Sequence, residues 1–314
     1  MKYIDNALTI DEQVSLLLSK GLKADTDKLA ERLQNVSYHR LSGYWHTFRN
    51  IKLESGDWSF HPGTDFSVIW DDYVFDRQLR LLVFDAIERI EVAIRDDLIL
   101  TLAVEHGPFG YLDPVNLPNI EAVNNTGDTV YTHKELVSYA RALCKREMKN
   151  GNPAVIDFHD RYSDEHGDDL PYWILLEIVE FGTLCRFVWG APTDIKKRIA
   201  QRYGLRTIDV MDSWMGALRS TRNAVAHHSR YWNRKHPVKP KIPNAKNPEW
   251  HTPVDIEPVK DRTFGVLTIL KYMMNHIAPQ SGWANRLEAL FAAHPNIDRR
   301  MLGYPDNWQE CPIW

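Results

Sequence analysis

The feature that most constrains the fold is a long apolar pattern with helical spacing between residues 65 and 105. Apolar side chains recur there every three or four positions, which is the spacing of one buried helix face. The pattern predicts one very long helix, and Gly107 and Pro108 predict its end. Similar patterns predict helices over 10–19, 27–36, 132–149, 153–162, 171–189, 193–203, 207–230, 261–277 and 282–293. The chain is therefore predicted to be all-α.

Three segments interrupt this helical pattern. Residues 37–63 are rich in aromatics, His, Ser and Gly, and they predict a short helix followed by a turn or small hairpin around Glu54–Asp57. Residues 107–128 and 235–259 are rich in Gly, Pro, Asn or Lys, which predicts loops. The predicted parts are an N-terminal helical and aromatic extension, a helical bundle with an insert at 107–168 and a basic loop at 235–259, and a C-terminal tail, with bounds 1–63, 64–294 and 295–314.

The charge of the chain is unevenly distributed. Residues 192–250 hold 13 Lys and Arg against four Asp and Glu, a local charge of +9 in a chain whose net charge is −4. A basic block in an acidic protein is typical of nucleic-acid binding. A solvated surface without a partner produces the same pattern, so charge alone leaves both interpretations open.

Cysteine usage and hydropathy indicate the cellular compartment in which the chain is expected. The three cysteines, Cys144, Cys185 and Cys311, are too few and too widely spaced for a disulfide framework or a structural zinc site. We therefore expect a reduced, cytoplasmic compartment. The first residues are partly acidic where a signal peptide is apolar, and no apolar run approaches the roughly 20 residues of a membrane helix. We expect no cofactor, no metal and no membrane insertion.

The candidate active residues lie in the stretch RNAVAHHSRYWNR at 222–234. Arg222 and His227 are separated by four residues, Asn223 follows the arginine, and His228 doubles the histidine. Arg222 lies at the border of the apolar face of the predicted helix. The opposite, polar stripe of an ideal helix would carry Gly216, Arg219, Asn223, His227 and Arg230.

These residue types suit cleavage of RNA without a metal. A histidine can take the proton of the attacking 2′-hydroxyl, and arginines can stabilise the extra negative charge of the pentacoordinate transition state. The alternative to a catalytic role is a structural one, in which these cations lie at a helix C-terminus and complement the helix dipole. An Arg followed by a His at similar spacing also occurs elsewhere in the chain, so the pair is not specific by itself.

Three sequence blocks together resemble the Abi-like (AbiD- and AbiF-like) abortive-infection family. They are YHRLSGYWHTFR at 38–49, FHPGTDFSVIWDDYVFDRQLRLLVFDAIERIEVAIRDDL at 60–98, and RSTRNAVAHHSRYWNR at 219–234, the last preceded by LPYWILLEIVEFGTL at 170–184. The resemblance implies the HEPN superfamily, whose fold is a four-helix bundle. It implies that the helices near 66–105, 171–189, 207–230 and 261–277 form that bundle.

The same resemblance implies an activity. This chain would be a metal-independent HEPN endoribonuclease and an anti-phage toxin, whose products end in a 2′,3′-cyclic phosphate and a 5′-hydroxyl. Arg222 and His227 would be catalytic, Asn223 the accompanying polar residue, and His228 an alternative to His227. The resemblance also implies a toxin–antitoxin arrangement with a small structured non-coding RNA, a homodimer that brings two motifs together, and a phage-encoded trigger.

We expect RNA to contact the basic block and the aromatic segment, whose rings could stack on unpaired bases. The alternative is that the segment YHRLSGYW is a packed corner that holds the N-terminal helices against the bundle. The predicted RNA contacts are Arg219, Arg230, Arg234, Lys235, Lys196, Lys197, Arg198, Tyr38, Arg40, Tyr44 and Trp45.

Two other functions stay open at this point. One is a non-catalytic HEPN module that only grips RNA phosphates. The other is a helical interaction protein that recognises a phage component. Glu91 and Arg95 on the long helix could orient a catalytic residue, but a structural ion pair is the favoured interpretation.

Overall fold

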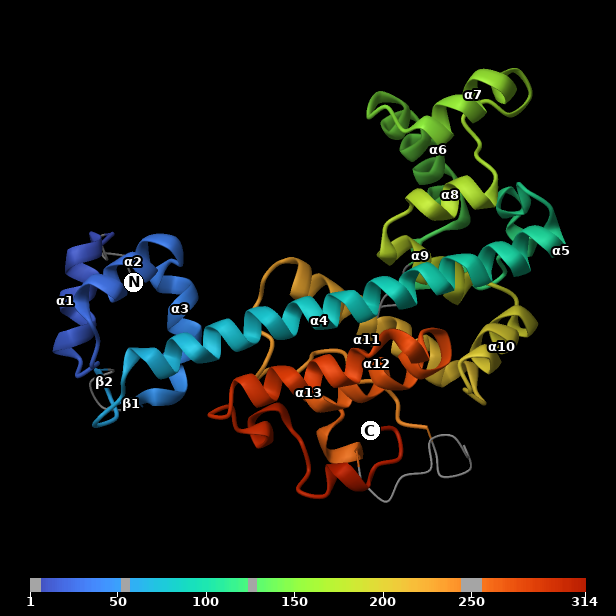
Figure 1. Ribbon diagram of the computed structural model, residues 1–314. Helices are drawn as coiled ribbons and strands as arrows, with labels where there is room; N and C mark the ends of the chain where they lie inside the picture. The colour runs from blue at the N-terminus through green and yellow to red at the C-terminus, as the bar shows by residue number, and fades with distance from the viewer. Residues whose placement is uncertain (1–6, 52–56, 124–128, 244–255) are drawn as a thin grey trace.

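A single long helix, α4 (Phe66–Leu98), runs through the length of the molecule (Figure 1). The computed structural model describes residues 7–51, 57–123, 129–243 and 256–314. Asp65 begins α4 by accepting the backbone N–H of Ser67, and a π-helical turn (Ile99–Ala103) and the short α5 (Val104–His106) continue the helix to Gly107. The predicted long helix and the all-α class are confirmed.

The N-terminal helices pack around the first turns of α4 (Figure 1). Thr9 and Asp25 accept backbone N–H groups at the starts of the first two helices, as their side chains predict. The strands of the predicted hairpin pair antiparallel with Arg49 opposite Phe60, whereas most of its predicted tip lies outside the described residues. The elements are α1 (Ile10–Ser19), α2 (Thr26–Asn35), α3 (Tyr38–Trp45), a 3-10 turn (His46–Phe48), β1 (Arg49–Ile51) and β2 (Trp58–Phe60).

A second group of helices forms a lobe over the far end of α4 (Figure 1). It comprises α6 (His133–Lys149), α7 (Pro153–His166) and α8 (Tyr172–Ile178). The segment predicted as a plain loop at 107–128 is more ordered than that, because Asp113 caps a 3-10 turn and a strand follows it. Its elements, with the partner strand, are the turns Gly110–Leu112 and Pro114–Asn116, β3 (Ala122–Val123) and β4 (Thr129–Tyr131).

The prediction of one continuous helix over 171–189 is wrong. α8 ends at Ile178, and α9 (Phe181–Gly190) begins after two extended residues. The buried guanidinium of Arg95 explains the break, because it donates to the carbonyl oxygens of Leu176 and Val179 and pairs with Glu91. A buried cation needs such acceptors. The contacts of Glu91 and Arg95 are those of a structural ion pair.

The main core lies where α4 packs against helices from the second half of the chain. α9, α11 (Ile208–Ala226) and α12 (Thr263–Ile277) are the other helices expected in the bundle, and all three contact α4. α13 (Trp283–Ala293) adds a further helix on α4, and α10 (Thr193–Arg202) packs against α11. Within the tail, the indole of Trp314 donates to Thr268 Oγ1 of α12 at 3.0 Å. Short 3-10 turns lie at Glu257–Val259, Pro279–Ser281, Arg299–Leu302 and Trp308–Glu310.

Candidate RNA-binding and active site

The helix that carries the candidate residues ends earlier than the sequence predicts. α11 ends at Ala226 rather than at residue 230, and His227 is its C-cap. The backbone N–H of His228 donates to Val225 O at 3.1 Å, and that of Ser229 donates to Ala224 O at 2.9 Å. These two bonds form a Schellman motif, the common way to end a helix. The predicted polar stripe therefore does not extend to Arg230.

His228 occupies the position of this motif that glycine normally takes. Its φ is +56°, and it is the non-glycine residue with positive φ in the described ranges. An L side chain in this conformation costs about 1–2 kcal/mol. Such strain persists only where surrounding structure holds it, and it is frequent at functional sites. Arg40 of α3 supplies one restraint, since its Nη1 donates to the carbonyl oxygen of His228 at 2.6 Å.

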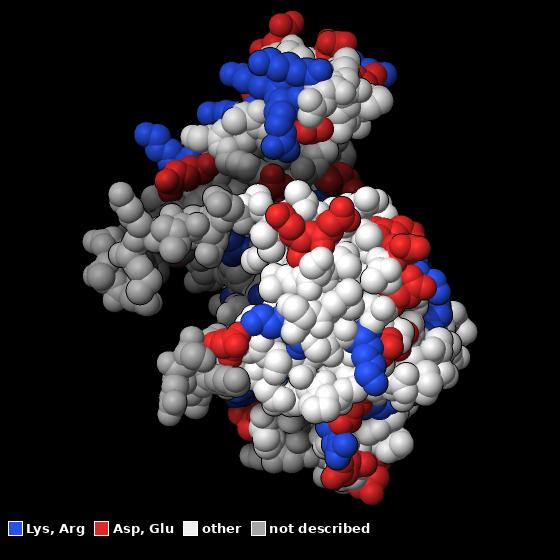
Figure 2. Space-filling view, turned by 90° about the vertical axis from the view of Figure 1, so that its left-hand side faces the viewer, with Lys and Arg blue, Asp and Glu red and all other residues white. Residues whose placement is uncertain are grey.

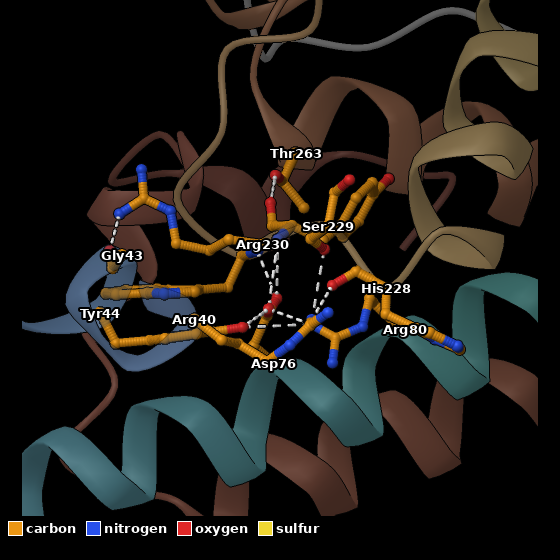
Figure 3. Close-up of polar contacts among 11 residues, drawn as sticks. Arg40, Gly43, Tyr44, Asp76, Arg80, His228, Ser229, Arg230 and Thr263 are labelled. Carbon is orange, nitrogen blue, oxygen red and sulfur yellow. Dashed lines mark hydrogen bonds and ion pairs between the residues drawn. The ribbon is translucent and has the colours of Figure 1, made fainter. Parts of the chain in front are cut away.

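The segment after α11 is tied to α4 by the buried carboxylate of Asp76 (Figure 3). Asp76 accepts the backbone N–H groups of Tyr231 and Trp232 at 3.0 and 2.6 Å, the hydroxyl of Tyr44 at 2.6 Å, and a bond from Arg80. Burial raises the pKa of Asp76, while Arg80, Tyr44 and the two amides oppose that rise. Because every partner is a donor, the network satisfies the ionised carboxylate.

Further contacts in Figure 3 join the same segment to α3 and α12. Arg230 donates to Gly43 O, so its side chain points to α3 and not along α11. Thr263 Oγ1 donates to Tyr231 O at 2.9 Å. The blocks around residues 38–49, 60–98 and 219–234 therefore meet in one network, which fixes the backbone on which His228 lies.

A pocket of about 610 Å³ opens beside His228, between α3, α4 and the end of α11. One part of its lining is apolar and includes Leu81 and Phe84, which are 60% and 42% exposed. The other part is cationic. The lining residues are Arg40, Tyr73, Arg77, Arg80, Leu81, Phe84, Val225, Ala226 and His228.

Comparison with known proteins identifies the family. A family model described as Abi-like protein matches residues 31–233, which is about two thirds of the chain and includes every residue that lines the pocket. The chain belongs to the Abi-like protein family. No curated protein and no solved structure matches it.

The predicted catalytic residues of this Abi-like protein do not all converge on the pocket. His228 lines it, whereas His227, Asn223 and Arg222 do not. His227 and Asn223 are exposed, and Arg222 is half-buried on α11, one turn before Ala226. Among the described residues, no partner accepts a bond from the buried Arg222 Nε.

The aromatic side chains predicted to stack on RNA bases lie in the protein core. Tyr44 and Trp45 are 2% and 0% exposed, so stacking by these two rings is a wrong prediction. Tyr38 is half-buried with its ring edge-on to Trp45, at 5.1 Å between centroids. The segment is the packed corner that the sequence offered as an alternative. Of its residues, Arg40 is exposed and reaches the pocket.

The basic block at 192–250 is partly neutralised by ion pairs. Lys196 is buried and pairs with Asp212 at 2.5 Å, so its predicted contact with RNA is wrong. Arg198 is exposed but pairs with Glu105 of α5. The remaining predicted contacts differ in position: Lys197 and Lys235 are exposed, Arg234 is half-buried, and half-buried Arg219 packs over Gly182 of α9.

A second cationic surface lies away from this block. Figure 2 shows Lys and Arg side chains gathered on the upper lobe, over α6. Its exposed cations are Arg141, Lys145, Arg146 and Lys149, of which the first three pair with acids.

Arg77, Arg80 and Phe84 were missed as site residues by reasoning from the sequence. One signal pointed to them, because Asp76 and Arg80 fall at the spacing of the apolar positions Phe75, Leu79 and Val83 of α4. Charged residues at core spacing need buried partners. A pair so placed therefore marks the helix turn on which the network and the pocket are built.

None of the described helices is both long and apolar enough to cross a membrane.

Proposed function

We propose that this Abi-like protein is a metal-independent endoribonuclease that acts as an abortive-infection toxin. The observation that carries the proposal is His228, an exposed imidazole held in a strained backbone conformation beside three arginines. A proton-transfer group next to fixed cations is the combination that RNA cleavage requires.

The chemistry is an intramolecular displacement within the RNA. The 2′-oxygen attacks the neighbouring phosphorus and gives its proton to His228, while the bond from phosphorus to the 5′-oxygen breaks. The leaving 5′-oxygen takes a proton from water, and the hydroxide that remains takes the proton from His228, which restores the neutral imidazole. Guanidinium groups of Arg40 and Arg77 stabilise the charge that develops on the phosphoryl oxygens. The products are a 2′,3′-cyclic phosphate and a 5′-hydroxyl.

Two observations support His228 over His227 in this role. His228 lines the pocket with the arginines, whereas His227 is an exposed C-cap residue outside the lining. Arg40 also fixes the backbone of His228 directly. Arg222 is half-buried on the neighbouring turn of α11 with its Nε buried, so it would support the site from beside the pocket.

The test compares two single variants on cellular RNA in the presence of a chelator, with the new ends sequenced. His228→Gly suits the backbone at this position, and it should lower cleavage by about 100-fold or more. His227→Ala is the matched control and should retain most of the activity. Cleavage that survives in His228→Gly but disappears in His227→Ala would move the role to the neighbouring histidine.

The second candidate is a non-catalytic RNA-binding module. The observation that favours it is the separation of Arg222 from the residues that line the pocket with His228. In that case the wild-type protein would bind RNA tightly and leave it intact in every condition, including purified protein stripped of its own RNA.

We also propose that a small structured RNA restrains the toxin, and that the active form is a homodimer released by a phage-encoded trigger. The exposed cations of α6 support a second RNA contact, because they gather on one lobe (Figure 2), although three of the four also pair with acids. Purification from the native host should yield one discrete RNA with the protein. Sizing with and without that RNA would test the change of assembly.

A further inference from the structure

The pocket beside His228 combines two kinds of surface that a phosphate grip alone would not need. On one side, Arg77 is exposed, and among the described residues no carboxylate or carbonyl oxygen accepts a bond from it. On the other side, Phe84 and Leu81 present large apolar side chains to solvent on the next turn of the same helix.

The charge of the pocket is not balanced from within. Its described lining contains Arg40, Arg77, Arg80 and His228 but no acidic side chain. Asp76 neutralises Arg80 from the core, where the carboxylate is fully buried. One nitrogen of the Arg40 guanidinium, Nη1, donates to the carbonyl oxygen of His228. The guanidinium groups of Arg40 and Arg77 therefore favour an anionic occupant.

The size of the pocket limits that occupant to a small group. About 610 Å³ lies within the range of sites that hold a single small molecule. A base pair inside a duplex cannot enter such a pocket, because its faces are covered by stacked neighbours.

We infer that the pocket holds one unpaired nucleotide of the RNA, with its base against Phe84 and its phosphate between Arg40 and Arg77. This inference rests on the proposed function, because it takes RNA as the ligand. An exposed aromatic ring offers a stacking face to any base, and the fork of a guanidinium matches a phosphate. The substrate is then single-stranded or looped RNA, and His228 lies beside the phosphate that is gripped.

The test uses a short single-stranded 2′-O-methyl RNA with one 2-aminopurine, and the same strand in a duplex. The 2′-O-methyl groups remove the nucleophile, so binding is measured without cleavage. The full-length protein should bind the single strand more tightly than the duplex and quench the 2-aminopurine. Phe84→Ala should weaken binding about tenfold and abolish the quenching, because a stacking contact is lost. Phe84→Tyr should restore both.

Arg77→Ala should weaken binding of both RNAs and lower the salt dependence of binding by about one phosphate contact, without changing the quenching. Two matched controls should bind like the wild type. Val92→Ala removes a side chain that is 53% exposed on α4 outside the pocket. Lys28→Ala removes an exposed cation on α2.

The outcomes separate this inference from the proposed function. Unchanged binding by Phe84→Ala and Arg77→Ala, in a protein that still cleaves RNA, overturns the nucleotide pocket and leaves the endoribonuclease standing. A wild-type protein that neither binds nor cleaves RNA overturns both. If Phe84→Ala instead turns a dimer into a monomer while RNA binding per chain is unchanged, the surface is a contact between copies and the inference is wrong.

Discussion

Among the described residues, the contacts that hold His228 are made by its backbone and not by its ring. Arg40 binds its carbonyl oxygen, and the two helix-ending bonds fix its φ at +56°. Asp76 holds the chain three and four residues further on. A strained residue at a functional site is expected to lower the free energy of unfolding while it supports activity.

His228→Gly should therefore raise the free energy of unfolding by about 1 kcal/mol, because glycine adopts positive φ without a steric cost. Urea denaturation of the two proteins measures the difference. His228→Ala is the control, since its Cβ keeps the steric cost and the gain should be absent. A loss of stability in His228→Gly would mean that the imidazole has a structural role.

Asp72 predicts a pH dependence of stability. Burial, with Asp71 and Asp76 nearby, raises the pKa of Asp72 from 3.8 to about 7. The folded protein thus prefers the protonated acid, so this group contributes most stability below about pH 4 and loses that contribution as pH rises toward 7. Asp72→Asn should stabilise the protein at pH 8 by at most about 4 kcal/mol and change little at pH 4. Thermal melts of both proteins between pH 4 and pH 8 check whether Asp72→Asn raises the melting temperature at the higher pH.

The Asp76 network joins three elements that are distant in the sequence. Its donors come from α3, from α4 itself and from the segment after α11. Burying a carboxylate and a guanidinium together is costly unless they are paired, and here Arg80 pairs with Asp76 while Tyr44 bonds to both. The network therefore sets how α3 and the end of α11 lie on α4, and with them the shape of the pocket.

Asp76→Asn should lower the free energy of unfolding by about 3–5 kcal/mol, because it leaves the buried Arg80 unpaired. It should also abolish RNA cleavage, although Asp76 does not line the pocket. Asp157→Asn removes the carboxylate of an exposed pair with Arg161 at 2.7 Å. It should cost less than about 0.5 kcal/mol, which makes it a matched control in the same denaturation series. Equal effects of the two substitutions would contradict the importance of the network.

At the scale of the whole molecule, the basic block does not act as one surface. Arg202 of α10 pairs with the buried Asp97 of α4, and Arg198 pairs with Glu105. These pairs join α10 to the end of the long helix. Lys197 and Lys235 of the block are exposed but do not line the pocket beside α3, and a further set of cations covers α6 (Figure 2).

Lys196→Ala should therefore affect stability rather than RNA binding. It leaves Asp212 without its partner and should cost about 1–3 kcal/mol, with RNA affinity unchanged in a filter-binding assay. Arg77→Ala should show the opposite pattern. If Lys196→Ala weakened RNA binding in a protein of unchanged stability, the block would be an RNA surface after all.

The sequence by itself determined most of the helices of this protein. Helical periodicity is a property of neighbouring residues, so the long helix was predictable, and a small hairpin was one of the two alternatives predicted around Glu54–Asp57. The motif stretches also identified the family that the comparison found. Arg40 and His228 lie in these motif stretches, and both were among the predicted site residues.

Only the tertiary structure decided which of these residues meet. The break between α8 and α9 depends on Arg95, about 80 residues earlier in the chain. Arg40, Arg77 and His228 line one pocket because α3 and the end of α11 dock on α4. The hydroxyl of the buried Tyr44 donates to Asp76, which lies 32 residues further along the chain. Contacts between distant segments leave no period in the sequence, so Asp76 and Arg80 marked a buried pair on α4 but not the segments that meet there.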